Sequence, residues 1–154
     1  MKKLVRDRHG RVLEFSQVRH DHLVYFKLEF QTASAAYAHG RIETDALILV
    51  DLFVQDQCIV IERNFLPRLF GRKTYQVNFR QQGIGTQLLT TVIAYAKAKK
   101  LKRIEGALEE KELALNPRLP QWCQKRGFTV AESRFTLDLT SRAPSDDSRY
   151  MPKN

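Results

Sequence analysis

The residues with the clearest chemical potential stand together at positions 80–86, "RQQGIGT", directly before a long run with helical periodicity. The start of a helix exposes unpaired backbone N–H groups and the positive end of the helix dipole. Glycines at such a start let an anion approach the backbone without a Cβ in the way. We therefore expect a pyrophosphate cradle here, with a plain strand-to-helix turn as the alternative. The residues of this expected cradle are Arg80, Gln82, Gly83, Ile84, Gly85 and Thr86.

Two other glycine-rich phosphate loops do not match this segment. A dinucleotide-binding fingerprint requires a third glycine two residues further on, but Gln87 and Leu88 follow Thr86. A P-loop requires Gly-Lys-Ser/Thr at its end, and no lysine occurs after the glycines until Lys97. The pattern thus excludes both of these nucleotide sites.

The elements before the glycine loop are expected to be strands. Runs rich in aromatic and β-branched residues, or alternating in polarity, occur at 11–15, 23–31, 34–43 and 46–54. The links between them are short, which favours an antiparallel meander. The last run, "ALILVDLFV", is almost entirely apolar, as is typical of a strand buried on both faces.

Residues 55–78 are harder to assign. The stretch "CIVIER" at 58–63 is compatible with another strand or with an extension of the preceding hairpin. Residues 64–75 contain Pro67 and Gly71 and indicate an ordered loop. This loop and the residue before it are strongly basic, through Arg63, Arg68, Arg72 and Lys73.

The elements after the glycine loop alternate. Apolar residues at helical spacing predict a helix over 84–99, and a strand is expected at 102–108. A second helix is expected to start with Asn116 as its N-cap and Pro117 at its first position, and to end at Gly127 in the left-handed conformation. Strands at 128–132 and 134–139 complete the sheet, and the polar residues 140–154 predict a disordered tail.

The glycine segment and the helix after it resemble the acetyl-CoA-binding motif of the GNAT superfamily of N-acetyltransferases, written Gln/Arg-x-x-Gly-x-Gly/Ala. The downstream segment "NPRLPQWCQKRGF" is similar to the family's second segment, in which a helix ends in Gly-Phe. The strand "LVDLFV" resembles the family's fourth strand. The resemblance covers about residues 46–139.

This resemblance implies an α+β fold with a mixed, mostly antiparallel central sheet flanked by helices. It implies one domain over residues 1–139, with residues 55–78 as an insertion between the fourth strand and the glycine loop. The family places a helix pair between its first two strands, for which residues 15–22, "FSQVRHDH", are too short. We therefore expect a reduced N-terminal helical part and an acceptor site that is open or completed by a partner chain.

The resemblance also implies transfer of an acetyl group from acetyl-CoA to an amine by direct attack in a ternary complex. Gly83 and Gly85 would then hold the CoA pyrophosphate, and the pantetheine arm would run along residues 51–54. A backbone N–H near Phe53 or Val54 would meet the oxyanion, and Asn116 matches an asparagine that often lies near the arm.

Candidate catalytic groups follow from the same comparison. Cys123 occupies the position of the family's general-acid tyrosine, although a small apolar residue packed in the core is the alternative interpretation. A carboxylate whose pKa is raised by burial can accept a proton from the amine. Asp51, Glu105 and Glu109 are the candidates for this base, each with a solvated charge as the alternative.

The net charge of +9 favours an anionic partner, which is nucleic acid, acidic lipid headgroups or a phosphorylated cofactor, or it is simply a solvated basic surface. A polyanion or a protein is therefore an expected partner. The acceptor amine stays open, and a homodimer would complete the acceptor side. The alternative function is a GNAT-like module that has lost catalysis and binds nucleic acid or a ribosomal or protein surface.

Two cysteines without a disulfide framework and no long apolar run predict a cytoplasmic protein that does not enter a membrane. We expect no metal site, because His20 and His22 lack a third and a fourth ligand nearby.

Overall fold

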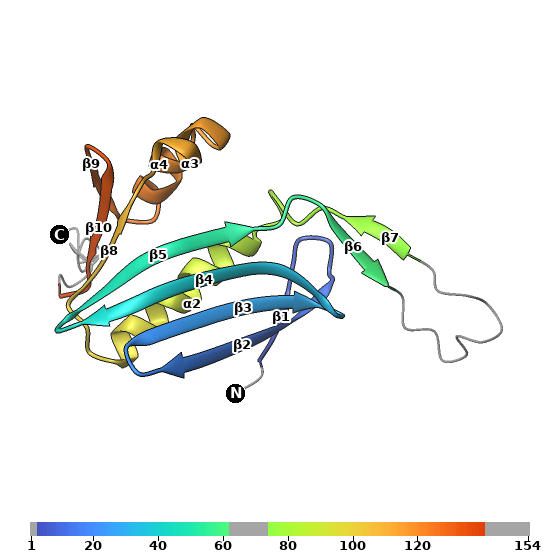
Figure 1. Ribbon diagram of the computed structural model, residues 1–154, viewed down its shortest axis with the longest axis horizontal. Coiled ribbons are helices and arrows are strands. Elements are labelled where there is room, and N and C mark those ends of the chain that lie inside the picture. Colours follow the sequence, from blue (N-terminus) through green and yellow to red (C-terminus); the bar gives the residue numbers. More distant parts are fainter. Residues whose placement is uncertain (1–2, 62–73, 141–154) are drawn as a thin grey trace, which may run out of the picture.

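The computed structural model describes residues 3–61 and 74–140. An eight-stranded sheet forms the body of these residues, in the order β1-β2-β3-β4-β5-β8-β10-β9, and the long helix α2 lies across one of its faces (Figure 1). The sheet strands are β1 Lys3–Arg6, β2 Val12–His20, β3 Leu23–Phe30, β4 Ala33–Glu43, β5 Ala46–Val54, β8 Arg103–Ala107, β9 Thr129–Ala131 and β10 Arg134–Asp138. The helices are α2 Ile84–Ala98, α3 Glu110–Leu115 and α4 Leu119–Gln124. None of these described helices has the length and apolar character that a bilayer crossing requires.

The first five strands form the expected antiparallel meander. Asp21 and His22 alone join β2 to β3, and Asp21 takes a positive φ of 53° to make the turn. The prediction that no helix pair separates these strands is therefore confirmed. Strand β1 was not expected, because its four residues lie in a basic stretch with little alternation.

The sheet buries the face that packs on α2. Phe26 and Leu28 of β3 and Leu47 of β5 point inward and are almost fully buried, as are Leu88 and Val92 of the helix. The opposite face, called the open face below, carries exposed apolar side chains instead. The exposed side chains on it include those of Val18, Tyr25, Tyr37 and Phe53.

The expectation that residues 46–54 are buried on both faces is wrong. Val50 is 57% exposed and Phe53 is 36% exposed, because α2 covers only one face of β5. The apolar run thus indicated a strand correctly, but its composition did not reveal which face has a covering layer.

Strands β5 and β8 separate after a short stretch of parallel pairing. They pair from Ala46–Arg103 to Leu49–Gly106, after which β5 continues beside β4 and β8 continues beside β10. A side chain at Gly106 would overlap the ring of Phe135. The absence of a Cβ at Gly106 therefore allows this ring to fill the point where the strands part, and the two strands diverge in a V beyond it (Figure 1).

A β-bulge accompanies this separation. His39 pairs with Asp51 and Gly40 pairs with Leu49, which leaves Val50 as the extra residue of β5. A Cβ at Gly40 would stand 2.9 Å from Leu47 Cδ1, so the close approach of the strands requires glycine.

The expected insertion at 55–78 contains a separate two-stranded sheet. Strands β6 Cys58–Ile61 and β7 Thr74–Val77 pair antiparallel and project beyond the main sheet (Figure 1). The basic loop predicted between them lies outside the described residues, as does the predicted tail from residue 141 onward.

The prediction for the second helix is wrong in its start. Asn116 does not cap the N-terminus of a helix but ends α3, where its N–H donates to the Glu112 carbonyl (2.8 Å). Helix α4 begins later, with Arg118 as N-cap and Pro120 in its first turn. Gly127 takes the expected left-handed conformation after α4, with φ 87°.

Candidate active site

The glycine loop presents the start of α2 without any neutralising side chain. Gly83 is the N-cap residue in a left-handed conformation, with φ 81°, and it offers no side-chain cap. The first turn of the helix holds no acidic residue. The N–H groups of this turn and the positive end of the dipole are therefore left for a group outside the helix.

Gly85 sits where three elements meet. A Cβ at this position would stand 3.3 Å from Val54 Cγ2, at the end of β5, and 3.8 Å from Trp122 Cζ2, on α4. Glycine at this point lets the start of α2 lie directly against the end of β5. The start of α2 consequently opens onto the V between β5 and β8.

Arg126 brings a positive charge to the same place. Its Nη2 donates to Thr86 Oγ1 (2.5 Å), its Nη1 donates to the Trp122 carbonyl (3.0 Å), and its guanidinium carbon lies 4.2 Å from the centre of a Trp122 ring. Its Nε is buried and has no hydrogen-bond partner among the described residues. A cation with an unused donor at the positive end of a helix is the arrangement that an anion stabilises.

A turn at the N-terminal end of the chain also lies against the glycine loop. The backbone N–H of Arg8 donates to the Gln82 carbonyl (3.3 Å), and Arg8 Nη1 reaches the Gln81 carbonyl (3.5 Å). The Nε of Arg8 lies 3.6 Å from the position that a Cβ on Gly83 would take. Arg8 therefore adds a second positive charge beside the loop, and Arg80, which pairs with Asp56 at 3.6 Å, adds a third.

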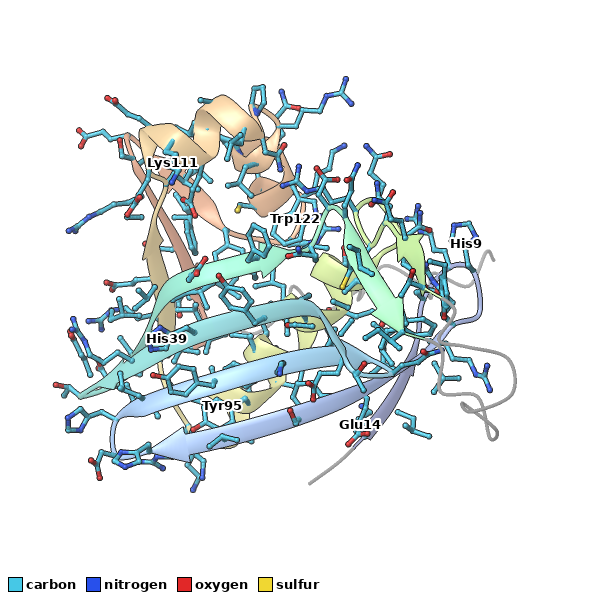
Figure 2. All side chains as sticks on the ribbon, turned by 45° about the vertical axis from the view of Figure 1, so that its right-hand side comes forward. His9, Glu14, His39, Tyr95, Lys111 and Trp122 are labelled. Carbon is cyan, nitrogen blue, oxygen red and sulfur yellow. The ribbon has the colours of Figure 1, made fainter. Side chains whose placement is uncertain are left out.

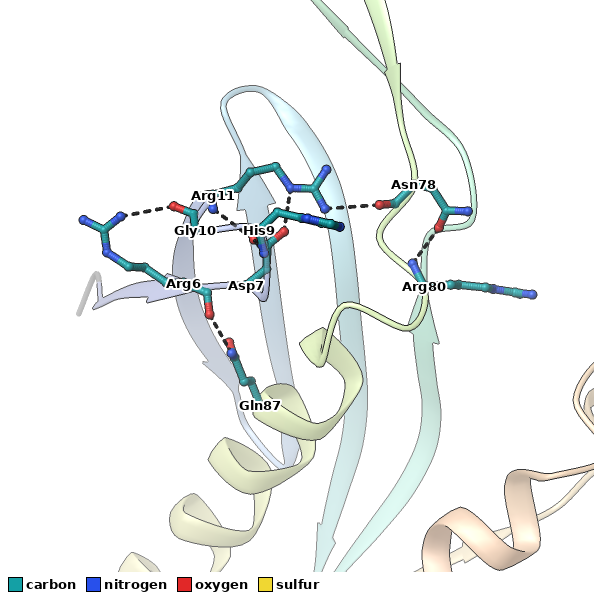
Figure 3. A network of polar contacts seen from close by, with 8 residues as sticks. All are labelled: Arg6, Asp7, His9, Gly10, Arg11, Asn78, Arg80 and Gln87. Carbon is teal, nitrogen blue, oxygen red and sulfur yellow. Dashed lines mark hydrogen bonds and ion pairs between the residues drawn. The ribbon is translucent and has the colours of Figure 1, made fainter.

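Asp7 holds this turn in shape (Figure 3). Its carboxylate accepts the backbone N–H groups of His9 and Arg11 (2.9 Å each) and the Nε of Arg11 (2.5 Å). Burial by itself would raise the pKa of Asp7, but these hydrogen bonds and the Arg11 charge lower it below its ordinary value. Arg11 Nη2 in turn donates to the Asn78 carbonyl (3.2 Å), and Gln87 on α2 donates to the Arg6 carbonyl (2.6 Å).

A groove lies between β5 and β8, where the two strands diverge. Leu49, Val50, Asp51 and Leu52 form its β5 wall, and side chains from α4 and from the end of β8 form the other. Trp122 stands at the junction of this groove with the glycine loop (Figure 2). The groove is mainly apolar, with Asp51 and Glu112 as its carboxylates and Cys123 as its thiol.

Cys123 is almost fully buried in this groove. Burial raises the pKa of its thiol, the Arg126 charge opposes this rise and the Glu112 charge adds to it, and the resulting pKa is about 11. The side chain is therefore a protonated thiol at neutral pH, able to donate a proton and unable to act as a thiolate nucleophile.

Asp51 lies where the groove meets the open face of the sheet. It stands opposite His39 in the β4–β5 register. Burial raises the pKa of Tyr37, and a hydrogen bond and the charge from Asp51 raise it further. Asp51 thus faces a tyrosine hydroxyl and lies beside a histidine, with no Lys or Arg ion pair among the described residues.

The other candidate residues lie elsewhere. Glu105 forms an ion pair with Arg103 on β8, and Glu109 caps the start of α3. Neither carboxylate, nor the exposed Asn116, is among the described residues that line the groove. The structure therefore brings together Asp51, Val54 and the glycine loop with Cys123, and separates them from the remaining candidates.

Sequence reasoning missed three residues of this site. Arg8 and Trp122 reach it from segments far from the glycine loop, and no local pattern marks them. Arg126 is part of the "KRGF" segment, which marks the end of a helix, but a basic residue at a helix end does not by itself indicate an anion site.

Comparison with known proteins gives structural matches only. No protein-family model and no curated protein matches the sequence. Among solved structures, the ribosomal-protein-S18-alanine N-acetyltransferase from Escherichia coli superposes with a TM-score of 0.56 at 14% identity, over 82% of this chain and 76% of that one. The PaiA N-acetyltransferase from Thermoplasma acidophilum, solved in complex with coenzyme A, gives a TM-score of 0.51 at 12% identity, over 75% of this chain and 60% of that one.

The chain has the GNAT fold. Its mixed, mostly antiparallel sheet with flanking helices confirms the predicted fold class. A cAMP-binding acyltransferase from Mycobacterium smegmatis shares this GNAT fold over 99% of the present chain, with a TM-score of 0.62 and 13% identity. The chain spans only 50% of that protein, and at identities this low the likeness concerns the fold alone.

Proposed function

We propose that this chain is a GNAT superfamily N-acetyltransferase that transfers the acetyl group of acetyl-CoA directly to an amine. The observation that carries the proposal is the start of α2. Its first turn has no acidic residue, it opens beside Gly85 onto the groove, and its Thr86 hydroxyl accepts from Arg126, whose buried Nε has no hydrogen-bond partner among the described residues. The GNAT fold, and coenzyme A in the PaiA structure, support the same ligand.

The residues present fit acetyl-CoA. The N–H groups of residues 83–86 would hold the pyrophosphate, and Arg126, Arg80 and Arg8 would balance its charge. The apolar groove along residues 51–54 would take the pantetheine arm. A Cβ at Gly85 would lie tightly against Val54 (3.3 Å) and in contact with Trp122 (3.8 Å), so glycine leaves more room here than any other residue.

The chemistry assigned to the site moves two protons and one acetyl group. Asp51 would take a proton from the acceptor ammonium, after which the amine nitrogen attacks the thioester carbon. A backbone N–H near Phe53 or Val54 would hold the oxyanion. The C–N bond forms as the C–S bond breaks. Cys123 would give its proton to the departing thiolate and regain one from the acetylated nitrogen, and Asp51 would release its proton to solvent.

The proposal is tested by calorimetric titration of CoA into the wild type and the Gly85→Asp variant. The substitution adds bulk and negative charge where the pyrophosphate is expected, so micromolar binding by the wild type should weaken by at least about tenfold, which is 1.4 kcal/mol. The matched control is Ala94→Asp, which adds the same charge to an exposed position of α2. Absence of CoA binding by the wild type would refute the proposal.

A further inference from the structure

Two pairs of aromatic rings lie side by side on the open face of the sheet. Tyr25 on β3 stacks on His39 on β4, with ring centres 4.4 Å apart and planes 8° apart. Tyr37 on β4 lies 5.6 Å from Phe53 on β5. Tyr25, Tyr37 and Phe53 are between 36% and 42% exposed, and Figure 2 shows His39 on this same face. The rings form a platform that solvent reaches, because none of the described helices covers this face of the sheet (Figure 1).

A single carboxylate stands at the border between this platform and the groove. Asp51 contacts the Tyr37 hydroxyl and lies opposite His39. On the same face, by contrast, Glu29 is already paired with Lys27 (2.7 Å). The Nε2 of His39 is buried and has no hydrogen-bond partner among the described residues. One anionic group therefore stands at the mouth of the groove, next to a histidine whose ring belongs to the platform.

These features describe the ligand that would complement them. Aromatic faces attract cations and flat apolar groups, and one carboxylate neutralises one ammonium. A polyamine would need several carboxylates along its path. Among the described residues, Asp51 is the one carboxylate that the platform shares with the groove, whose other carboxylate is Glu112 on α3. The protein's net charge of +9 repels multiply charged cations from a distance.

We infer that the acceptor is a primary amine with a single ammonium group on an aromatic or similarly flat apolar body. The ring of the acceptor lies on Tyr37 and Phe53, and its ammonium meets Asp51 at the groove. This inference rests on the proposed acetyltransferase function, and it assigns the acceptor to the open face of the sheet.

The test compares amines in protein saturated with CoA, where no product forms, and then follows acetylation with acetyl-CoA. The probes are 2-phenylethylamine, n-butylamine and spermidine. We expect 2-phenylethylamine to bind and to be acetylated with a kcat/KM at least tenfold above the other two. Tyr37→Ala should weaken its binding at least tenfold and leave CoA binding unchanged. Tyr75→Ala is the matched control, because Tyr75 is equally exposed, at 39%, but lies on β7 outside the platform.

The outcomes separate the inference about the acceptor from the proposed acetyltransferase function on which it rests. If CoA binds and spermidine or n-butylamine is preferred, the inference is wrong and the acetyltransferase proposal stands. If Tyr75→Ala weakens 2-phenylethylamine binding as much as Tyr37→Ala does, the platform is not the site. If the wild type binds no CoA, both the inference and the proposed function fall together.

Discussion

Arg126 places a positive charge beside the N-terminus of α2, where a negatively charged side chain would be more favourable. The positive end of a helix dipole repels a guanidinium, yet Arg126 is held there by Thr86 and by the ring and carbonyl of Trp122. A phosphate group bound between the helix N-terminus and Arg126 would attract both of them, so the repulsion between the two would be offset. Removing the charge should therefore affect ligand binding far more than folding.

We expect Arg126→Gln to lower the affinity for CoA by about tenfold or more, since a charge-assisted hydrogen bond contributes about 1.5–3 kcal/mol. The loss should shrink at high salt, because part of it is long-range attraction. Calorimetry at two salt concentrations measures both effects. Arg134→Gln, an exposed arginine on β10, serves as control and should not alter affinity.

Asp51 and Glu105 differ in a way that kinetics can separate. Glu105 already has a cation partner in Arg103, whereas Asp51 faces the groove. We expect Asp51→Asn to lower kcat/KM by roughly 10²- to 10⁴-fold, the usual contribution of a general base, without changing CoA affinity. Steady-state rates with 2-phenylethylamine provide the measurement. An equal loss in Glu105→Gln would argue against Asp51 as the base.

The buried thiol of Cys123 should make stability depend on alkaline pH. Its folded-state pKa of about 11 exceeds the ordinary value of 9.0, so the folded state holds this proton more tightly than the unfolded state. The resulting stabilisation is complete below about pH 9 and is lost as the pH rises through the folded pKa.

Urea unfolding between pH 8 and 11 measures this dependence. The free energy of unfolding should fall less steeply with pH in Cys123→Ala than in the wild type. Cys58→Ala, which removes the half-buried thiol on β6, should retain the wild-type slope. Identical slopes in all three proteins would contradict the assignment.

At the scale of elements, the sequence predicts best where one strong periodicity acts alone. The helix predicted over 84–99 ends one residue from the observed α2, and the predicted meander strands correspond to β2–β5. The prediction for residues 109–118 was wrong because the sequence signals in this segment conflict. Helix α3 buries no residue, so it shows no apolar stripe, and the Asn-Pro pair suggested a helix start where a helix ends.

The residues of the candidate site also differ in how far the sequence predicts them. The glycines and Asp51 were predictable, because a local motif and a strand end mark them. The positions of Arg8 and Trp122 depend on which distant segments the fold brings to the start of α2, and a single sequence contains no such information. The open face was only half predictable, since the missing helix pair showed that it would be bare but not that two ring pairs would occupy it.

The turn at 7–11 is the element whose effect on the site is most open to test. Since hydrogen bonds lower the pKa of Asp7, its stabilisation is present above the unfolded value of 3.8 and is lost as the pH falls through the lower folded value. Asp7→Asn should cost about 2 kcal/mol in stability at neutral pH. It should also speed hydrogen exchange in residues 80–83, against which the turn packs.

Urea denaturation and hydrogen exchange followed by mass spectrometry measure these two effects. Asp21→Asn, in the exposed turn between β2 and β3, is the matched control and should change neither quantity. If Asp7→Asn destabilises the protein but leaves exchange at 80–83 unaltered, the turn does not support the glycine loop.

At the scale of the whole molecule, the sheet consists of two parts that share only a short parallel contact. Four residue pairs join β5 to β8, and the proposed ligand site lies where the two parts diverge. A ligand there contacts both parts and should couple their stability. The helix α2, which packs on strands of both parts, is the other element that links them.

Saturating CoA should therefore protect the entire sheet. At a ligand concentration 100-fold above Kd the expected stabilisation is about 2.7 kcal/mol, equivalent to a rise in Tm of roughly 5–10 °C. Differential scanning fluorimetry measures the rise, and hydrogen exchange should slow in β10 as well as in β4. Slowing confined to the glycine loop would contradict the coupling.

The homodimer and the polyanionic partner stay predictions at this scale, as does the cytoplasmic location. A dimer that covered the open face would compete with the acceptor site inferred above. Sedimentation of the protein with and without 2-phenylethylamine would reveal such competition as a shift in the monomer fraction.

The two-residue turn formed by Asp21 and His22 has a practical consequence for protein engineering. Its residues are exposed, and they join the two strands that border the aromatic platform on one side. A randomised segment inserted between them would extend over the open face without interrupting α2, β5 or the glycine loop. The chain thus offers a scaffold in which libraries of acceptor-contacting loops can be selected while the proposed donor-binding half stays constant.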